Sequence, residues 1–217
     1  ATLAGCGGFY FTGGDQRRVT AAFYRANGEA TLGLEALWAA HAAGACVSGS
    51  SAGAAVISDP MITGGTSADA LYYGAAPQGS GARGVEIGRG LGFYPGAMFD
   101  QHHLVRGRLG RLIVATEAAG FRYGFGVDEN TALAMDPETG WADVLGAMGV
   151  FVVDLAAARR APDNKRAGIR LHYLDTGDRF HMTTGEVAVG GAKTALALDP
   201  SATGAVTSAD IWAEYEA

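Results

Sequence analysis

The sequence is poor in cysteine and carries no surplus of positive charge, and each shortage excludes a class of protein. Its 217 residues include only two cysteines, Cys6 and Cys46, which stand far apart and form no CxxC pattern. We therefore expect neither a disulfide framework nor a zinc site, although a single bridge stays open. The net charge of −6 argues against binding to nucleic acid or to a membrane surface.

Long apolar runs are also missing. No stretch is long enough to span a bilayer and no secretory leader is visible, so we expect a cytoplasmic rather than a secreted protein. The chain is 48% hydrophobic and 18% charged, which is typical of a globular protein. Its 6 prolines and 34 glycines predict tight turns and close backbone contacts rather than flexible linkers. We expect residues 1–217 to form a single α/β domain.

Strands and helices alternate in the first half of the chain. We expect a strand at residues 7–12, a helix at 16–25 capped by Asp15, and a second helix capped by Thr31 and stopped at Gly44. A strand at 45–48 follows. This alternation predicts an α/β sheet with parallel strands.

The second half of the chain is less regular. Residues 63–92 show no clean period, so we expect a long functional loop there, with a hairpin as the alternative. Further strands are expected at 96–100 and 121–127. Between them we expect a helix that starts near Asp100 and buries Leu104, Leu109, Leu112 and Ile113. Short apolar runs after residue 144 predict more strands.

The stretch from Cys46 to Val56 predicts a short strand, a sharp turn of small residues and the start of a helix. At its centre is a G-x-S-x-G pattern with Ser51 in the middle. A nucleophilic serine must project from a strained turn between strand and helix, where neighbouring side chains would collide. The first N–H groups of the helix can then stabilise an oxyanion. The pattern alone also fits a plain turn of Gly, Ser and Ala.

Polar residues follow four of the predicted strands, and the carboxyl ends of strands are where open α/β sheets bind ligands. A serine nucleophile needs a base within hydrogen-bond distance, and the base needs an acid to orient it. Ser51, His102 and Glu129 supply these three roles. A lone histidine and a turn glutamate also have ordinary structural explanations.

Three arginines, Arg106, Arg108 and Arg111, are predicted to share one helix with Gly107 and Gly110. A solvated basic face is the ordinary explanation. Each glycine weakens a helix by about 1 kcal/mol, however, so we expect the backbone to approach a substrate or another strand there. Arginines beside a serine site indicate a substrate that bears a carboxylate.

Several motifs occur together in a fixed order: GGDQ at residues 13–16, GSSAGA at 49–54, SDPMI at 58–62, DQH at 100–102 with RGRLGRL at 106–112, and GVDE at 126–129. In this combination the chain resembles the cyanophycinases and their relatives in the serine peptidase family that also contains aspartyl dipeptidase. The resemblance covers about residues 13–133. Residues 174–180 also resemble the C-terminal strand of that family.

The resemblance implies a fold like that of class I glutamine amidotransferases: flavodoxin-like α/β, with a mostly parallel sheet and helices on both faces. It implies that Ser51 is the nucleophile, His102 the base and Glu129 the acid. Backbone N–H groups of Gly14 and Ala52 would then hold the oxyanion. The residues that would line the substrate pocket are Gln16, Asp100, Gln101, Arg106, Arg108 and Arg111.

The substrates implied are β-aspartyl peptides, such as pieces of cyanophycin, in which arginine is attached to aspartate side chains. The arginine cluster would bind the free α-carboxylate of the β-aspartyl residue. The resemblance implies no cofactor, and no metal is expected, since adjacent His102 and His103 lack ligand spacing. We expect a homodimer.

The chain departs from the family in a few places. Ser50 stands where Thr is common, Val127 where Ile is common, and His103 where an aromatic residue is more usual. The family also has a strand and a glycine-rich loop before the GGDQ motif. We expect that strand to come from an associated N-terminal fragment of the same protein, or to be dispensable.

Two other functions stay open. In an esterase of the α/β-hydrolase type the order is serine, acid, histidine, so its base would be His172 or His181. An amidotransferase-like scaffold could also act as a binding module without catalysis, because a fold does not determine a function.

Overall fold

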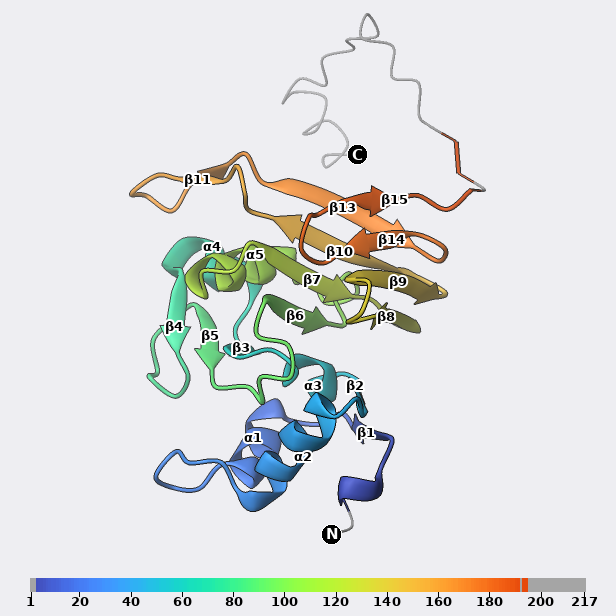
Figure 1. Cartoon of the computed structure of the whole chain (residues 1–217). Coiled ribbons are helices and arrows are strands. Elements are labelled where there is room, and N and C mark those ends of the chain that lie inside the picture. Colours follow the sequence, from blue (N-terminus) through green and yellow to red (C-terminus); the bar gives the residue numbers. More distant parts are fainter. Residues whose placement is uncertain (1–2, 192, 195–217) are drawn as a thin grey trace, which may run out of the picture.

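The computed structural model describes residues 3–191 and 193–194 (Figure 1). The first half contains a short 3-10 helix at Leu3–Gly5 and then, in chain order, β1 (Gly8–Phe11), α1 (Gln16–Phe23), α2 (Leu32–Ala42), β2 (Cys46–Gly49), α3 (Ala52–Ala55), β3 (Met61–Gly64), α4 (Ser67–Tyr73), β4 (Ala75–Pro77), β5 (Val85–Gly88), β6 (Ala97–Gln101), α5 (Leu109–Ala118) and β7 (Tyr123–Val127). The second half is made of strands: β8 (Thr131–Met135), β9 (Trp141–Gly146), β10 (Gly149–Asp154), β11 (Arg159–Arg160), β12 (Arg166–Ala167), β13 (Arg170–Asp175), β14 (Arg179–His181) and β15 (Val187–Ala188).

The first two helices begin where predicted, because local chemistry sets their starts, but α1 ends at Phe23, before the predicted end at residue 25. The Asp15 carboxylate accepts the backbone N–H of Arg17, and the Thr31 hydroxyl accepts that of Leu34. Each side chain therefore satisfies a donor that the first turn of the helix leaves free. Gly44 follows α2 with a φ of +99°, which a residue with a side chain rarely adopts. These helices lie with β1 at one end of the molecule (Figure 1).

The prediction of a mostly parallel sheet is wrong for the described residues. Three pairs of strands are parallel: β1–β2, β4–β5 and β6–β7. The other pairs are antiparallel, in the sheets β13-β10-β7-β6 and β15-β14-β9-β8, in β3–β5 and in the small β11–β12 hairpin. Short turns join many of the strands after β7, and such turns are too short for the crossover that parallel neighbours require.

Residues 63–92 form regular structure, so the predicted long loop is also wrong. This segment contains α4, the end of β3 and the whole of β4 and β5, which pair in the order β3-β5-β4. It also contains turns at Gly65, Gly74 and Gly84 with positive φ. The glycine turns divide the segment into pieces too short to show a period. Thr66 caps α4 by accepting the N–H of Asp69.

The predicted helix over the arginines starts later than expected. Turns occupy the residues after His102, and α5 begins only at Leu109, so Arg106 and Gly107 precede it and Arg108 is its N-cap. Gly107 adopts a φ of +58° in this turn. Leu104, predicted to be buried, is 45% exposed because it lies in the same turn.

Gly110 has a packing role inside α5. A Cβ at this position would stand 2.9 Å from the side chain of Ser67 and 3.0 Å from that of Leu71, both on α4. The close approach predicted from the glycines is therefore real at Gly110, but the neighbour is a helix rather than a strand or a substrate.

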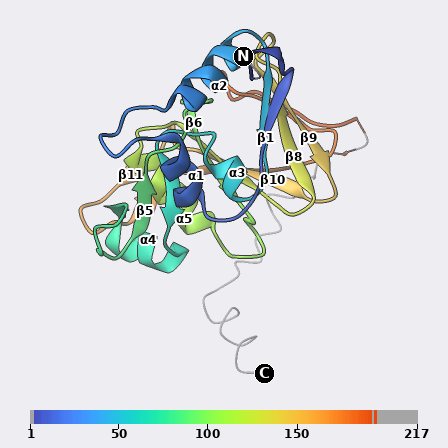
Figure 2. The ribbon, with the colours of Figure 1, turned by 90° about the horizontal axis from the view of Figure 1, so that it is seen from below.

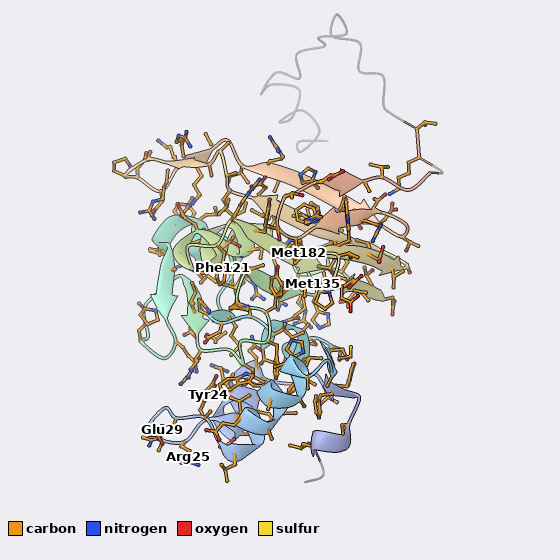
Figure 3. The ribbon with its side chains drawn as sticks, in the orientation of Figure 1. Tyr24, Arg25, Glu29, Phe121, Met135 and Met182 are labelled. Carbon is orange, nitrogen blue, oxygen red and sulfur yellow. The ribbon has the colours of Figure 1, made fainter. Side chains whose placement is uncertain are left out.

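Three clusters of buried side chains make up the core. One joins the two C-terminal sheets around Phe125 and Phe180, whose rings meet edge to face at 5.4 Å. Figure 3 labels Met182 of this cluster among the C-terminal strands, and Tyr24 at the far end near α1. A second cluster lies under α5, and the third lies around α2 and Leu91. The view from below shows α3 between α1 and β1 (Figure 2). Among the described helices, none is long and apolar enough to cross a bilayer.

Candidate active site

Ser51 occupies a strained turn between β2 and α3. Its φ of 52° and ψ of −117° lie outside the regions that L-residues favour, at a cost of about 1–3 kcal/mol. Glycines make this turn possible: a Cβ on Gly53 would overlap the carbonyl of Phe11, and one on Gly49 would overlap that of Gly53. The backbone therefore makes a sharp, strained turn between strand and helix, which is the kind of turn that a nucleophilic serine requires.

His102 and Glu129 reach this serine from two neighbouring strands. His102 follows β6 and Glu129 follows β7, and because β6 and β7 are parallel, their carboxyl ends lie side by side. His102 Nε2 lies 2.9 Å from Ser51 Oγ, and His102 Nδ1 lies 2.6 Å from Glu129 Oε1. An Nδ1–H donated to Glu129 leaves Nε2 free to accept the proton of Ser51. The three side chains thus form a continuous hydrogen-bonded relay.

Two backbone segments border the serine. A Cβ on Gly13 would stand 3.2 Å from the Cβ of Ser51, so Gly13 lies against the strained turn. Gly14 follows it with a φ of +135°. Ala52 is the first residue of α3, and the N–H of such a residue has no acceptor within the helix.

Two of the three predicted arginines are held next to the relay by Asp100 and Gln101. Arg111 is buried and donates to Asp100 through Nε at 2.7 Å and Nη2 at 2.6 Å. Its Nη1 donates to the carbonyl of Gly65 at 3.0 Å. Arg108 donates through Nη1 to the carbonyl oxygen of Gln101 at 2.6 Å and to Oε1 of the same residue at 2.9 Å. Burial, together with the positive charge of Arg111, lowers the pKa of Arg108 to about 10, so it is still charged at neutral pH.

The other two predicted pocket residues have different surroundings. Arg106 lies exposed in the turn before α5, away from the buried pair of Arg111 and Asp100. Gln16, at the start of α1, donates its side-chain N–H to the carbonyl of Ile62 at 3.0 Å, which connects α1 to β3. The three arginines are therefore not equivalent: one is exposed, one is partly buried beside Gln101, and one is committed to Asp100.

Two histidines that an esterase would use lie elsewhere. His172 is on β13 and packs near Phe180, and His181 is on β14 against Trp141. The imidazole that contacts Ser51 belongs to His102, which precedes the acid in the chain. This order differs from that of the α/β-hydrolases.

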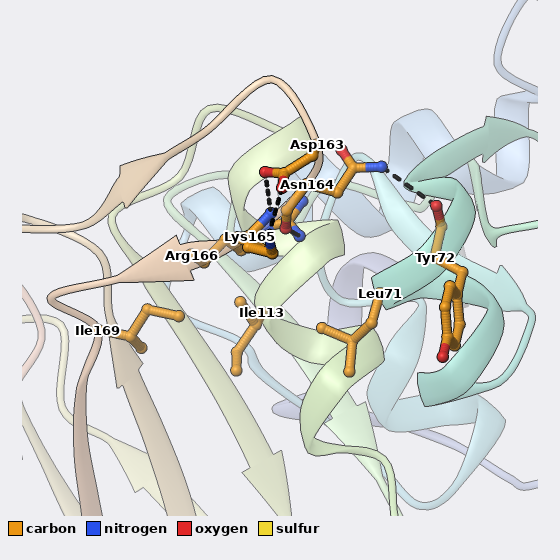
Figure 4. A pocket seen from close by; sticks show the side chains of 8 residues that line it. All are labelled: Leu71, Tyr72, Ile113, Asp163, Asn164, Lys165, Arg166 and Ile169. Carbon is orange, nitrogen blue, oxygen red and sulfur yellow. Dashed lines mark hydrogen bonds and ion pairs between the residues drawn. The ribbon is translucent and has the colours of Figure 1, made fainter.

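An open groove of about 430 Å³ lies away from these residues (Figure 4). Leu71 and Tyr72 of α4 form one side, Ile113 of α5 the floor, and Lys165 and Arg166 of the β11–β12 hairpin the other side. Arg166 is paired with Glu117 on α5 at 2.6 Å. None of the predicted site residues lines this groove. In the part of the chain that the structure describes, no three His, Cys, Asp or Glu side chains gather as metal ligands would.

Two residues near the relay have surroundings that could not be predicted from the sequence. His103 is 1% exposed and packs between Gly126 and Phe151. Asp128 accepts hydrogen bonds from the turn that follows His102 and from Tyr173 on β13. Such contacts join positions that are far apart in the chain, so no local sequence pattern predicts them.

Comparison with known proteins finds cyanophycinases. The chain is 35% identical over 191 residues to the cyanophycinase of Trichormus variabilis, and the match covers 84% of this chain and 59% of that protein. It is 31% identical over 204 residues to the cyanophycinase of Geminocystis herdmanii, with 85% and 66% covered. The chain thus spans about three fifths to two thirds of the length of these relatives.

Two further comparisons concern families and structures. No family model matches the chain. A solved peptidase from an acI-B1 Actinobacterium has a TM-score of 0.52 at 16% sequence identity, over 83% of this chain and 61% of the other. This likeness shows a shared mixed α/β fold.

Proposed function

Because this chain belongs to one family with the cyanophycinases, we propose that it is a serine-type peptidase that hydrolyses β-aspartyl peptide bonds. The observation that carries the proposal is the relay of Ser51, His102 and Glu129, with its contacts of 2.9 and 2.6 Å. The elbow at Ser51 and its neighbourhood are consistent with an arrangement like that of class I glutamine amidotransferases, with serine as the nucleophile.

The chemistry proposed is acyl transfer in two steps. Ser51 Oγ attacks the β-carbonyl of the aspartyl residue while His102 Nε2 takes its proton and Glu129 stabilises the resulting imidazolium. The N–H groups of Gly14 and Ala52 hold the negative oxygen of the tetrahedral intermediate. His102 then gives the proton to the leaving amine, and an ester on Ser51 forms. A water molecule, deprotonated by His102, hydrolyses this ester and restores the serine.

Arg108 is the proposed ligand for the α-carboxylate of the substrate. It is charged, partly buried and fixed by Gln101, and a buried guanidinium binds a carboxylate with good geometry and little loss of side-chain entropy. Asp100 and Arg111 would support the pocket through their own ion pair, and Gln16 through its bond to β3. Arg106, which is exposed, would contribute long-range attraction rather than a fixed contact.

Association with another polypeptide segment is also proposed. β1 and β2 form a two-stranded parallel sheet in which Gly8, Tyr10, Cys46 and Ser48 are exposed. Parallel sheets are normally covered on both faces, so a partner segment or a second copy of the chain would complete this one. Native mass spectrometry of the active protein would detect either, and a lone 22.2 kDa species with full activity would contradict the proposal.

Hydrolysis of a matched peptide panel tests the function. The panel contains β-Asp-Arg, β-Asp-Lys, β-Asp-Leu and a simple ester, with α-linked Asp-Arg as the control for linkage and Ser51→Ala as the control for the nucleophile. We expect turnover of β-linked peptides alone, lost in Ser51→Ala. Turnover of simple esters in preference to β-linked peptides would favour an esterase, and no turnover of any substrate would favour a binding module.

A further inference from the structure

Asp128 connects three segments around the relay. Its Oδ1 accepts the backbone N–H of Leu104 at 2.9 Å, and its Oδ2 accepts the hydroxyl of Tyr173 at 3.1 Å. Its own N–H donates to the carbonyl of Gly149 at 3.1 Å. Asp128 is 5% exposed, so these bonds lie in a region of low dielectric where they are strong and where their loss is costly.

The segment that Asp128 fixes is the one that carries the base. His102 has a φ of +49°, in the left-handed region that residues with a side chain enter only when their surroundings hold them. A turn without regular secondary structure follows it as far as Arg108. The bond from Leu104 to Asp128 is formed two residues after His102 and therefore restrains the backbone next to the strained residue.

Asp128 also precedes the acid of the relay in the chain. Glu129 follows it directly, and the Glu129 carbonyl accepts the hydroxyl of Thr131 at 3.0 Å. The buried side chain of Asp128 thus links the backbone beside His102 to the backbone that carries Glu129.

Aromatic rings of the sheet pack beside the hydrogen bonds of Asp128. Tyr173 packs against Phe151 with ring centroids 4.8 Å apart, and Phe151 packs against His103 at 5.4 Å. Tyr173 therefore lies in a stack that ends at the neighbour of His102. The hydroxyl at one end of this stack and the buried imidazole at the other both contact the loops of the relay.

We propose that Asp128 is a positioning residue, which acts through His102 and Glu129 by tying the two loops that carry them together. The proposal rests on the proposed serine peptidase function. Its role differs from general support of the fold because the relay tolerates little displacement: a shift of about 1 Å in a catalytic group can lower the rate about 100-fold.

Steady-state kinetics separate a positioning role from a structural one. In Asp128→Ala we expect kcat to fall about 100-fold with KM changed less than about threefold, in protein that is still folded at the assay temperature. Asp128→Asn keeps an oxygen acceptor for Leu104 and removes the same charge, so most of kcat should return. The matched control is Asp178→Ala, which removes another buried carboxylate that accepts backbone N–H groups, those of Asp175 and Gly190. It should lower the melting temperature and leave kcat unchanged.

A second measurement needs no substrate. NMR of ¹⁵N-histidine-labelled protein at about pH 9, where free histidine is neutral, reports which ring nitrogen of His102 carries the proton. The wild type and Asp128→Asn should show the Nδ1–H form, and Asp128→Ala a mixture of both forms. An unchanged kcat and an unchanged tautomer in Asp128→Ala would overturn the proposal, as would a mixture in the wild type. If the wild type hydrolyses nothing but its tautomer depends on Asp128, the peptidase function fails and the positioning role stands.

Discussion

Arg111 and Asp100 form a doubly hydrogen-bonded ion pair with almost no exposure to solvent, their side chains being 6% and 1% exposed. Removing one partner of such a pair leaves an unpaired buried charge and costs about 3–5 kcal/mol of folding free energy. We therefore expect Arg111→Ala to lower the free energy of unfolding by about that amount, as measured by urea denaturation. Arg106→Ala, on the exposed turn, should change it by less than about 0.5 kcal/mol. Equal effects of the two substitutions would contradict the assignment of Arg111 to the buried pair.

Arg108 is the proposed ligand for the α-carboxylate of the substrate. Loss of a hydrogen bond to a charged partner costs about 1.5–3 kcal/mol, which corresponds to about a 10- to 150-fold rise in KM for a β-aspartyl peptide in Arg108→Met. The free energy of unfolding should change much less than in Arg111→Ala, because the hydrogen bonds that Arg108 donates within the described residues go to Gln101, and Arg108 lies 3.8 Å from Asp100. A fall in kcat at unchanged KM would instead place Arg108 in the chemical step.

His103 makes stability depend on pH. Burial lowers its pKa, with Asp100 and Asp128 opposing this shift and Arg111 and Arg108 adding to it. As the pH falls below the unfolded-state pKa of about 6.5, the unfolded chain binds a proton that the folded protein does not, so the free energy of unfolding decreases until the lower, folded-state pKa is passed.

The histidine ring fills a site that an aromatic ring can also fill. It packs against Phe151 and occupies the space that a side chain on Gly126 would need, and neither of its ring nitrogens has a hydrogen-bond partner among the described residues. In urea denaturation at pH 7.5 and 5.0, His103→Phe should lose less stability between the two pH values than the wild type. The same loss in both proteins would show that other groups cause it.

In the proposed mechanism Glu129, which lies 2.6 Å from His102 Nδ1, orients and stabilises the imidazole. Glu129→Gln keeps the shape but favours the wrong tautomer, and changes of this kind lower kcat about 10³- to 10⁴-fold in serine hydrolases. Because the three groups act as a unit, the double variant Ser51→Ala/Glu129→Gln should be no slower than Ser51→Ala alone. A Glu129→Gln enzyme with more than about a tenth of the wild-type kcat would contradict the role given to this carboxylate.

The parts of the fold that the sequence predicts are those that depend on near neighbours. Asp15 and Thr31 cap helices through bonds to N–H groups two or three residues away, and Gly44 ends a helix through its own φ. The strained turn at Ser51 could be predicted for the same reason, because its glycines are within the motif.

The rest depends on contacts between distant segments. Gly110 lies in a helix so that α4 can pack against it, and from the sequence it is only a weak point in a helix. Arg111 looks like Arg106 in the sequence, yet one is buried against Asp100 and the other is exposed. Tyr173 reaches Asp128 across 45 positions of the chain, which no local pattern could show. The direction of the strands after β7 depends on which strands pair through hairpins. The alternation of strands and helices along the sequence does not determine that pairing.

Labelling with a fluorophosphonate probe tests whether Ser51 is a nucleophile that His102 activates. Peptide mapping by mass spectrometry should find one label per chain on Ser51 in the wild type. The label should be absent in Ser51→Ala, much slower to form in His102→Ala, and retained in Ser50→Ala, which removes the neighbouring hydroxyl of the same turn. A wild-type protein that takes up no label, or a label that persists in Ser51→Ala, would contradict the claim.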